Sequence, residues 1–191
     1  MRPFQIADEG YRFGVPDLDS DPQDEAGGLG RQLAVLDIDG VLADVRHRLH
    51  HLDSRPKNWD AFFGDAPDDP LLEEGLEVAL DLARGHDIVY LTGRPERCRL
   101  DTQTWLDRYG FPAGVLVMRR DTDRRPARMT KLEELNRLSR TAPVALLIDD
   151  DDRVVWAAVG AGYLVRHATW MYQERHEQQT LYDAQESEGR T

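Results

Sequence analysis

Cysteine is almost absent from this sequence: Cys98 is the only one among 191 residues, so no disulfide bond can form within the chain. Small secreted scaffolds that depend on several disulfide bonds are therefore excluded. No apolar run approaches the roughly 18 residues that span a bilayer, and the first ten residues lack the basic and then apolar pattern of a signal peptide. We therefore expect a soluble, cytoplasmic protein without membrane contact.

Positive charge is also scarce, because 24 Lys and Arg face 36 Asp and Glu, for a net charge of −12. Much of the excess lies at the ends, where residues 1–30 carry −5 and residues 171–191 carry −3. We expect residues 1–30 to be an acidic, flexible N-terminal segment and residues 171–191 to be a polar C-terminal tail. Residues 31–170 are long enough and apolar enough to form one domain. Such an acidic chain does not attract nucleic acid as a whole, although a local basic patch still can.

Short apolar runs alternate with segments of helical periodicity. The runs, which predict buried strands, cover residues 33–38, 87–91, 114–118, 142–148 and 162–165. The helical segments cover residues 71–84, 95–109, 127–140 and 153–160. Strands that alternate with helices in this way indicate an α/β fold, with a parallel sheet covered on both faces. Ligands bind such sheets beyond the carboxyl ends of the strands.

Polar side chains follow four of the predicted strands. In chain order they are Asp37 and Asp39, then Thr92, Gly93 and Arg94, then Arg119 and Arg120, then Asp149 and Asp150. Carboxylate oxygens suit Mg²⁺, and hydroxyl and cationic groups, with Lys131 from the following helix, could hold phosphate oxygens. Enzymes that transfer phosphoryl groups combine a metal ion held by carboxylates with Lys or Arg side chains in this way. Asp37 could attack phosphorus, while Asp39 could give a proton to the leaving oxygen and then take one from water.

Other interpretations of these motifs are less favoured. An Asp-x-Asp-Gly sequence can open a calcium loop, but here no third Asp precedes the glycine and a strand precedes the motif. Residues 149–152 could be a solvated acidic turn. Because Asp149 directly follows an apolar run, we favour a site there and expect Asp151 and Asp152 to be exposed. For Arg94, a substrate contact and a capping role remain equally open.

Four stretches, in order, resemble the motifs of the haloacid dehalogenase (HAD) superfamily of phosphatases. They are residues 36–43 (LDIDGVLA), residues 91–94 (LTGR), Lys131 and residues 147–150 (LIDD). The resemblance implies a Rossmannoid three-layer sandwich with a five-stranded parallel sheet. It also implies a Mg²⁺-dependent phosphomonoester hydrolase that acts through an aspartyl-phosphate intermediate.

The resemblance assigns expected roles to individual residues. Asp37 would be the nucleophile and a metal ligand, and Asp39 the general acid and base, with its backbone carbonyl on the metal. Asp149 would be a further metal ligand, supported by Asp150. The residues expected to bind the phosphoryl group are Thr92, Gly93, Arg94 and Lys131.

A finer resemblance concerns the substrate. Arg94, residues 118–126 and Lys131 are similar to the 3′-phosphatase domain of polynucleotide kinase-phosphatases, which removes 3′-phosphates from nucleic-acid ends. Nucleic-acid 3′ ends or nucleotides are thus the expected substrates, and Arg119 and Arg125 would contact backbone phosphates. The chain departs from these relatives in having Asp151 where they usually have Arg after the double Asp. It has no P-loop motif, so we expect no kinase activity, and we predict no stable protein partner.

Residues 44–70 form a long connection after the first strand and are predicted to be a flap or small cap. A cap this small would leave the site open to a large substrate. The aromatic residues Trp59, Phe62 and Phe63 would either pack the flap onto the body, which we favour, or stack on a base. A zinc site at the histidines of this segment is not expected, since no Cys or acid is spaced to complete it.

Two other functions remain open. A HAD phosphatase of a small phosphorylated metabolite would fit the net acidity of the chain. A non-enzymatic HAD-fold domain that binds nucleic acid or a partner is the other alternative, although such a domain would not need the pair Asp37 and Asp39.

Overall fold

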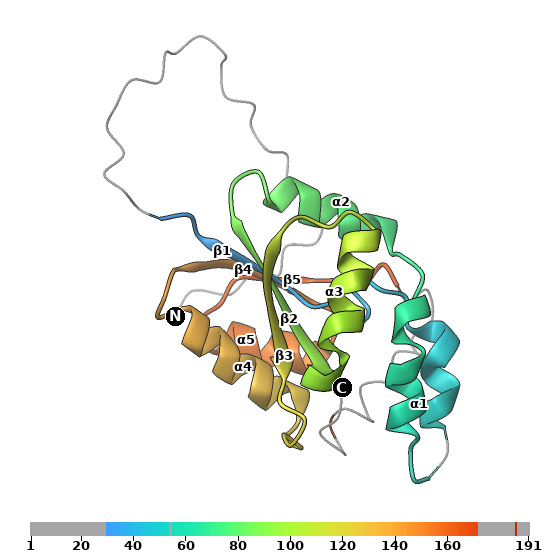
Figure 1. Ribbon diagram of the computed structural model, residues 1–191. Helices are drawn as coiled ribbons and strands as arrows, with labels where there is room; N and C mark the ends of the chain where they lie inside the picture. Colours follow the sequence, from blue (N-terminus) through green and yellow to red (C-terminus); the bar gives the residue numbers. More distant parts are fainter. Residues whose placement is uncertain (1–29, 54, 172–185, 187–191) are drawn as a thin grey trace, which may run out of the picture.

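The computed structural model describes residues 30–53, 55–171 and 186, so most of the two predicted terminal segments lies outside the described residues. Five strands form one parallel sheet in the order β3-β2-β1-β4-β5 (Figure 1). Their bounds are β1 Leu33–Leu36, β2 Asp87–Pro95, β3 Gly114–Arg119, β4 Val144–Asp149 and β5 Val165–His167. The predicted five-stranded parallel sheet is thus confirmed.

Four helices connect the strands and cover both faces of the sheet (Figure 1). They are α2 (Glu73–Leu82), α3 (Arg99–Arg108), α4 (Ala127–Leu138) and α5 (Asp152–Gly160). A short 3₁₀ turn, η3 (Glu96–Cys98), leads into α3. None of the helices in the described part of the chain is long and apolar enough to cross a lipid bilayer.

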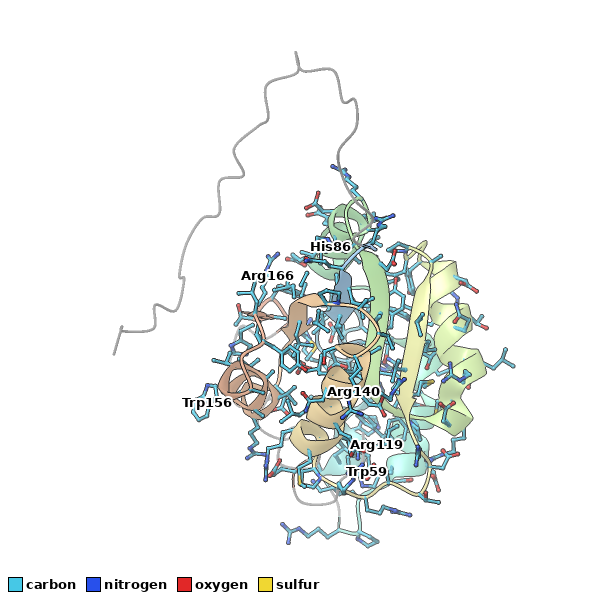
Figure 2. All side chains as sticks on the ribbon, turned by 90° about the vertical axis from the view of Figure 1, so that its left-hand side faces the viewer. Trp59, His86, Arg119, Arg140, Trp156 and Arg166 are labelled. Carbon is cyan, nitrogen blue, oxygen red and sulfur yellow. The ribbon has the colours of Figure 1, made fainter. Side chains whose placement is uncertain are left out.

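The side chains of β1 alternate between two separate cores. Ala34 and Leu36 pack in the core on the side of α2 and α3, where Trp105 is fully buried. Leu33 and Val35 pack in the other core, with side chains of α4 and α5. Each face of the sheet therefore has its own apolar layer, as the continuous apolar strands predict. Trp156 is an exception among the large apolar residues, since it projects from α5 into solvent and is 74% exposed (Figure 2).

The insertion after β1, residues 44–70, folds as three short helices that we call the flap: η1 (Arg46–Leu52), α1 (Trp59–Gly64) and η2 (Ala66–Asp68). Asn58 caps α1 by accepting a hydrogen bond from the Ala61 amide at 3.1 Å. The aromatic side chains of α1 are buried in the core shared with α3. They thus pack the flap onto the body, which is the interpretation that the sequence favours.

The strand order sets the position of the site. The chain runs outward from β1 to β2 and β3, and then returns to place β4 on the other side of β1. The crevice of such a sheet lies where the order reverses, between β1 and β4. Leu36 pairs with Ile148, and the Asp37 amide donates to the Ile148 carbonyl at 2.9 Å. Asp37 and Asp149 therefore follow directly opposed residues.

The predicted element boundaries hold to within four residues, with the largest shifts at the end of β2 and the start of α3. The start of β5 is also late. The apolar run at residues 162–165 predicts that strand, but pairing begins only at Val165. Gly162 has a φ of 92°, a left-handed conformation that ends the turn after α5. Residues 163 and 164 then lead from this turn to the sheet, so β5 begins at Val165 and not at residue 162.

Gly75 tests the contact between α2 and the loop after β1. A Cβ at this position would lie 2.1 Å from the Val41 carbonyl oxygen, which is backbone and cannot rotate away. We expect Gly75→Ala to lower the free energy of unfolding, measured by urea denaturation, by about 1–3 kcal/mol, despite the better helix propensity of alanine. Gly85→Ala is the matched control, since nothing lies within 4 Å of its Cβ. Equal stability of the two variants would contradict the packing argument.

Candidate active site

Two aspartates share one lysine at the centre of the site. Lys131 of α4 places its Nζ 2.7 Å from Asp37 Oδ2 and 2.7 Å from Asp149 Oδ2. All three side chains are buried. Burial raises the pKa of Asp37 to about 7; Lys131 opposes this rise and the charge of Asp149 adds to it. Burial alone would lower the pKa of Lys131, but Asp149 and Asp37 outweigh it and raise that pKa.

The carboxylates around Asp37 fit a divalent cation. Asp37, Asp149 and Asp150 each offer an oxygen within 4.8 Å of the others, and within the described residues they are the one such group of three. Asp37 Oδ1 is buried and has no hydrogen-bond partner among those residues. A buried carboxylate oxygen without a partner is unfavourable, and a cation would satisfy it. An oxygen-only donor set suits Mg²⁺.

Gly40 allows Asp150 to approach the loop after β1. Its φ is 84°, in the left-handed region, and a Cβ there would lie 1.8 Å from Asp150 Oδ2. Only glycine combines this conformation with the space that the carboxylate occupies. The glycine of the Asp-x-Asp-Gly motif is therefore required by the packing of Asp150 against the turn.

Asp151 corrects an expectation from the sequence. Predicted to be exposed, it is buried and caps α5 by accepting a hydrogen bond from the Arg153 amide at 2.8 Å. Burial, together with the charge of Asp149, raises the pKa of Asp151 to about 6. Asp152 is exposed as predicted. The sequence does not distinguish Asp151 from Asp152, since both belong to one run of acidic residues. Asp151 differs because it is the N-cap of α5, a position where Asp is favoured.

Asp39 is held by two buried arginines. Its Oδ1 accepts hydrogen bonds from Arg94 Nε at 2.8 Å, from Arg94 Nη2 at 2.6 Å and from Arg48 Nη2 at 2.8 Å. Burial by itself would raise the pKa of Asp39, but Arg94 and Arg48 outweigh it and the pKa is lowered. Asp39 Oδ2 is buried without a hydrogen-bond partner among the described residues. One oxygen is thus saturated while the other is available.

Asp69 supplies the second negative charge of this cluster. Its carboxylate accepts from Arg48 Nε at 2.6 Å and from Arg94 Nη2 at 2.6 Å, and it is fully buried. His47 Nε2 lies 2.8 Å from Asp69 Oδ1, and the Trp105 indole donates to the Asp69 carbonyl at 2.9 Å. Two buried cations thus face two buried anions, which is the condition for keeping such charges inside a protein. Asp69 also ties the flap to α3.

Sequence reasoning missed both Arg48 and Asp69. The signal that could have found them is indirect: a buried Asp39 needs a cation, and the flap contains arginines that follow the motif closely. The pattern does not distinguish Arg48 from its exposed neighbour Arg46, which pairs with Asp44. Burial of the one and exposure of the other follow from how η1 packs.

The predicted phosphate-binding group is divided between helix α4 and strand β2. Lys131 lies beside Asp37, whereas Thr92 and Arg94 come from the carboxyl end of β2, where the Arg94 amide donates to Thr92 Oγ1 at 3.1 Å. Gly93 lies between them and is buried. For Arg94, the sequence leaves substrate contact and capping open. Its guanidinium instead pairs with Asp39 and Asp69.

Arg119 and Arg125, predicted to bind substrate, are engaged within their own loop. Arg119 is buried at the end of β3 and its Nη1 donates to the Arg125 carbonyl at 2.7 Å. Burial lowers the pKa of Arg119 to about 10. Arg125 pairs with Asp123 at 2.7 Å and with Glu133. The two side chains therefore shape the loop between β3 and α4.

Solved structures with the same fold include chains of an RNA repair complex and a haloacid dehalogenase-like hydrolase. A chain of the Pnkp1/Rnl/Hen1 RNA repair complex matches with a TM-score of 0.63 and 21% identity, over 79% of this chain and 46% of its own. A second Pnkp1/Rnl/Hen1 complex gives 0.62 and 22%, over 81% and 50%. A haloacid dehalogenase-like hydrolase from Streptococcus pneumoniae gives 0.51 and 13%, over 82% and 92%. The chain spans about half the length of the two repair-complex chains, and at these identities the likeness concerns the fold.

The strand order, with buried carboxylates at the ends of β1 and β4 and a lysine from α4, fits a phosphatase domain of the HAD superfamily, and the family model that matches the chain is of this class. The family can be stated more closely. A family model described as the polynucleotide kinase PNKP phosphatase domain matches residues 31–164, and the chain belongs to this family. The comparison with curated proteins found no relative of similar sequence.

Mg²⁺ binding to the carboxylate group can be measured without any substrate. A ligand at 100 times its Kd stabilises the folded state by about 2.7 kcal/mol, which raises the Tm of a chain this size by about 5–10 °C. We expect Mg²⁺ to raise the Tm of the wild type by this order and to raise that of Asp149→Asn by less than half as much. Asp152→Asn is the matched control and should keep the full shift, because Asp152 is exposed. Equal shifts in wild type and Asp149→Asn would contradict the assignment.

Proposed function

We propose that this protein is a Mg²⁺-dependent phosphomonoester hydrolase that acts through an aspartyl-phosphate intermediate on 3′-phosphate ends of nucleic acid or on nucleotides. The observation that carries the proposal is the meeting of Asp37, Asp149 and Lys131 at distances of 2.7 Å, beside an Asp39 with one available oxygen. Membership of the PNKP phosphatase family favours a nucleic-acid end, as does the similarity to chains of an RNA repair complex.

Asp37, Asp149 and Asp150 would hold the metal, together with the backbone carbonyl of Asp39. When bound, Mg²⁺ offsets the negative charge on the phosphoryl oxygens and on the carboxylates that must approach them. Burial, with the charge of Asp149 in addition, raises the pKa of Asp37, so an ionised Asp37 is unfavourable at this place without a further cation. The protein groups then remain to position the phosphoryl group and to move protons.

In the first step a carboxylate oxygen of Asp37 forms a bond to phosphorus, and the bond from phosphorus to the leaving oxygen breaks. Lys131, Thr92 and the backbone at Gly93 hold the phosphoryl oxygens, where charge develops. Asp39 gives its proton to the leaving oxygen, which departs as a neutral hydroxyl group. The products of this step are the aspartyl-phosphate and the alcohol.

In the second step Asp39 takes a proton from water, the water oxygen bonds to phosphorus, and the bond from Asp37 to phosphorus breaks. Inorganic phosphate leaves, Asp37 is again a free carboxylate, and Asp39 again carries the proton, which it releases when the site empties. Arg94 and Arg48 occupy Oδ1 of Asp39, so the proton resides on Oδ2. The arginines keep Asp39 ionised at rest, and a bound phosphoryl anion raises its pKa and favours uptake of the proton that it later donates.

A phosphorylated small metabolite is the second candidate substrate. Two observations favour it: the net charge of −12, and the engagement of Arg119 and Arg125 within their own loop. A panel of sugar phosphates, nucleotides, and 3′- or 5′-phosphorylated oligonucleotides, assayed with Mg²⁺ and with a chelator, separates the two candidates. Preference for the 3′-phosphorylated strands supports the first candidate, and preference for one sugar phosphate supports the second.

Asp37→Asn tests the nucleophile. We expect it to lower turnover of an aryl phosphate by at least about a thousandfold, because an amide cannot form the acyl phosphate. Circular dichroism and Tm check that the fold is retained, and Asp152→Asn should keep wild-type activity. Substantial turnover by a folded Asp37→Asn protein would refute the proposed role of Asp37.

Asp39→Asn tests proton transfer. A poor leaving group such as an alkoxide needs the proton, whereas a good leaving group such as a nitrophenolate departs largely without it. We expect the first step to slow by about 10²–10⁴-fold for an alkyl phosphate and much less for an aryl phosphate, as measured by release of the alcohol in single-turnover kinetics. Equal losses for the two substrates would assign Asp39 a role other than acid.

A further inference from the structure

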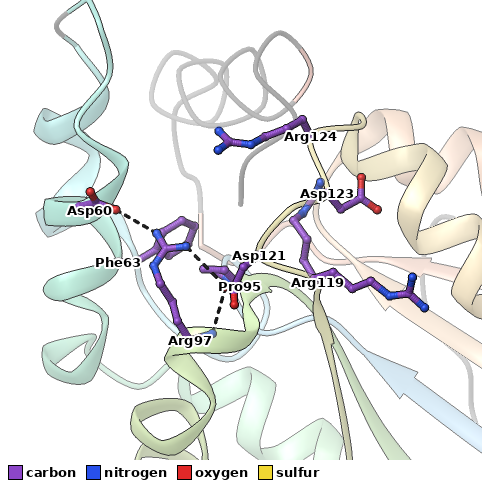
Figure 3. A pocket seen from close by; sticks show the side chains of 9 residues that line it. Asp60, Phe63, Pro95, Arg97, Arg119, Asp121, Asp123 and Arg124 are labelled. Atoms are coloured by element: carbon purple, nitrogen blue, oxygen red, sulfur yellow. Dashed lines mark hydrogen bonds and ion pairs between the residues drawn. The ribbon is translucent and has the colours of Figure 1, made fainter.

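A pocket of about 220 Å³ lies between α1 of the flap and the loop that joins β3 to α4 (Figure 3). Pro95, at the carboxyl end of β2, lines this pocket and lies opposite Arg119 of β3 in the sheet register. Arg94, which pairs with Asp39, immediately precedes Pro95. The pocket therefore begins one residue beyond the arginine whose guanidinium binds Asp39.

Most charged groups that line the pocket are already paired. Arg97 binds Asp60 of α1 at 3.1 Å and Asp121 at 3.6 Å, and it lies over the Phe63 ring at 5.5 Å. Asp123 is paired with Arg125. The acidic side chains of the pocket are therefore neutralised by Arg97 and Arg125.

Two arginines of the pocket lining, Arg120 and Arg124, differ from these paired groups. Both line the pocket, both are exposed, and neither has an ion pair with any described residue. In Figure 3 the Arg124 side chain extends toward α1, whereas that of Arg119 points the other way. The lining of the pocket therefore includes two exposed arginines, and guanidinium groups bind phosphate oxygens well.

We propose that this pocket binds the phosphodiester next to the 3′-terminal phosphate of a nucleic-acid strand, with Arg120 and Arg124 as its ligands. The inference rests on the proposed function, which it deepens by naming the part of the substrate beyond the reacting phosphate. The pocket is smaller than the roughly 300–1,000 Å³ of sites for drug-sized ligands, so it suits a phosphate and part of its sugar. A small monophosphorylated metabolite has no second phosphate to place there.

The experiment compares three substrates: a short DNA strand with a 3′-phosphate, a nucleoside 3′-monophosphate and an aryl phosphate. For the wild type, kcat/KM should be highest for the strand. The double variant Arg120→Ala/Arg124→Ala should lose about tenfold or more on the strand, mainly through KM, and keep wild-type values on the other two substrates. Its plot of log kcat/KM against log salt concentration should be shallower by about 1 for the strand.

Arg84→Ala/Arg140→Ala is the matched control. It removes two exposed arginines from the connections that precede β2 and β4, at the opposite edge of the sheet, and changes the net charge equally. A general electrostatic effect would appear in both double variants, whereas a phosphate contact appears only in Arg120→Ala/Arg124→Ala. Equal values in the two variants, or an equal loss on all three substrates, would overturn the inference.

Two other outcomes separate the inference from the proposed function. A wild type that hydrolyses the aryl phosphate but does not prefer the strand to the mononucleotide overturns the inference and leaves the phosphatase chemistry intact. If the wild type hydrolyses none of the three, the proposed function fails. Fluorescence anisotropy of the labelled strand then decides on the pocket: a tenfold weaker Kd for Arg120→Ala/Arg124→Ala than for the control supports it, and equal Kd values overturn it.

Discussion

Carboxylates that are removed from water must be neutralised, and this requirement organises the whole edge of the sheet. The charges of Asp37 and Asp149 are compensated by Lys131 of α4, a helix that packs on one face of the sheet. Asp39 depends on arginines from β2 and from the flap. Removing either set of cations would leave buried charge without compensation, which is strongly destabilising. The positions of α4 and of the flap are therefore fixed by electrostatics as well as by apolar packing.

The same compensation gives two aspartates, separated by one residue, opposite properties. Lys131 only partly offsets the burial and the neighbouring charge that raise the pKa of Asp37, whereas Arg94 and Arg48 lower the pKa of Asp39. In the proposed mechanism the first residue needs a cation before it can approach phosphorus, and the second needs only to gain and lose one proton. Neighbouring groups whose pKa values are driven apart are a common basis for a division of catalytic roles.

Much of the fold and part of the site follow from the sequence because they depend on local patterns. Continuous apolar runs predict a doubly covered parallel sheet, and residues at the carboxyl ends of such strands must meet at one edge, which predicts that Asp37 and Asp149 come together. The resemblance to the HAD motifs adds Lys131 from the following helix. The second half of the site could not be predicted in this way. Arg48 and Asp69 lie in an irregular insertion, and their burial is set by how the flap packs against α3. The same holds for the loop after β3, where Arg119 and Arg125 bind within the loop while Arg120 and Arg124 face outward.

Asp69 joins the flap, the end of β2 and α3 through one carboxylate and one carbonyl. The flap therefore cannot be shortened freely: a deletion that removes Asp69 leaves Arg48 and Arg94 with Asp39 as their one remaining anionic partner among the described residues. The connection between η1 and α1 is different, since lengthening a surface loop is entropically inexpensive. Insertions between η1 and α1 would leave both helices in place. A peptide tag could therefore be inserted there without disturbing Asp69, which binds Arg48 and Arg94.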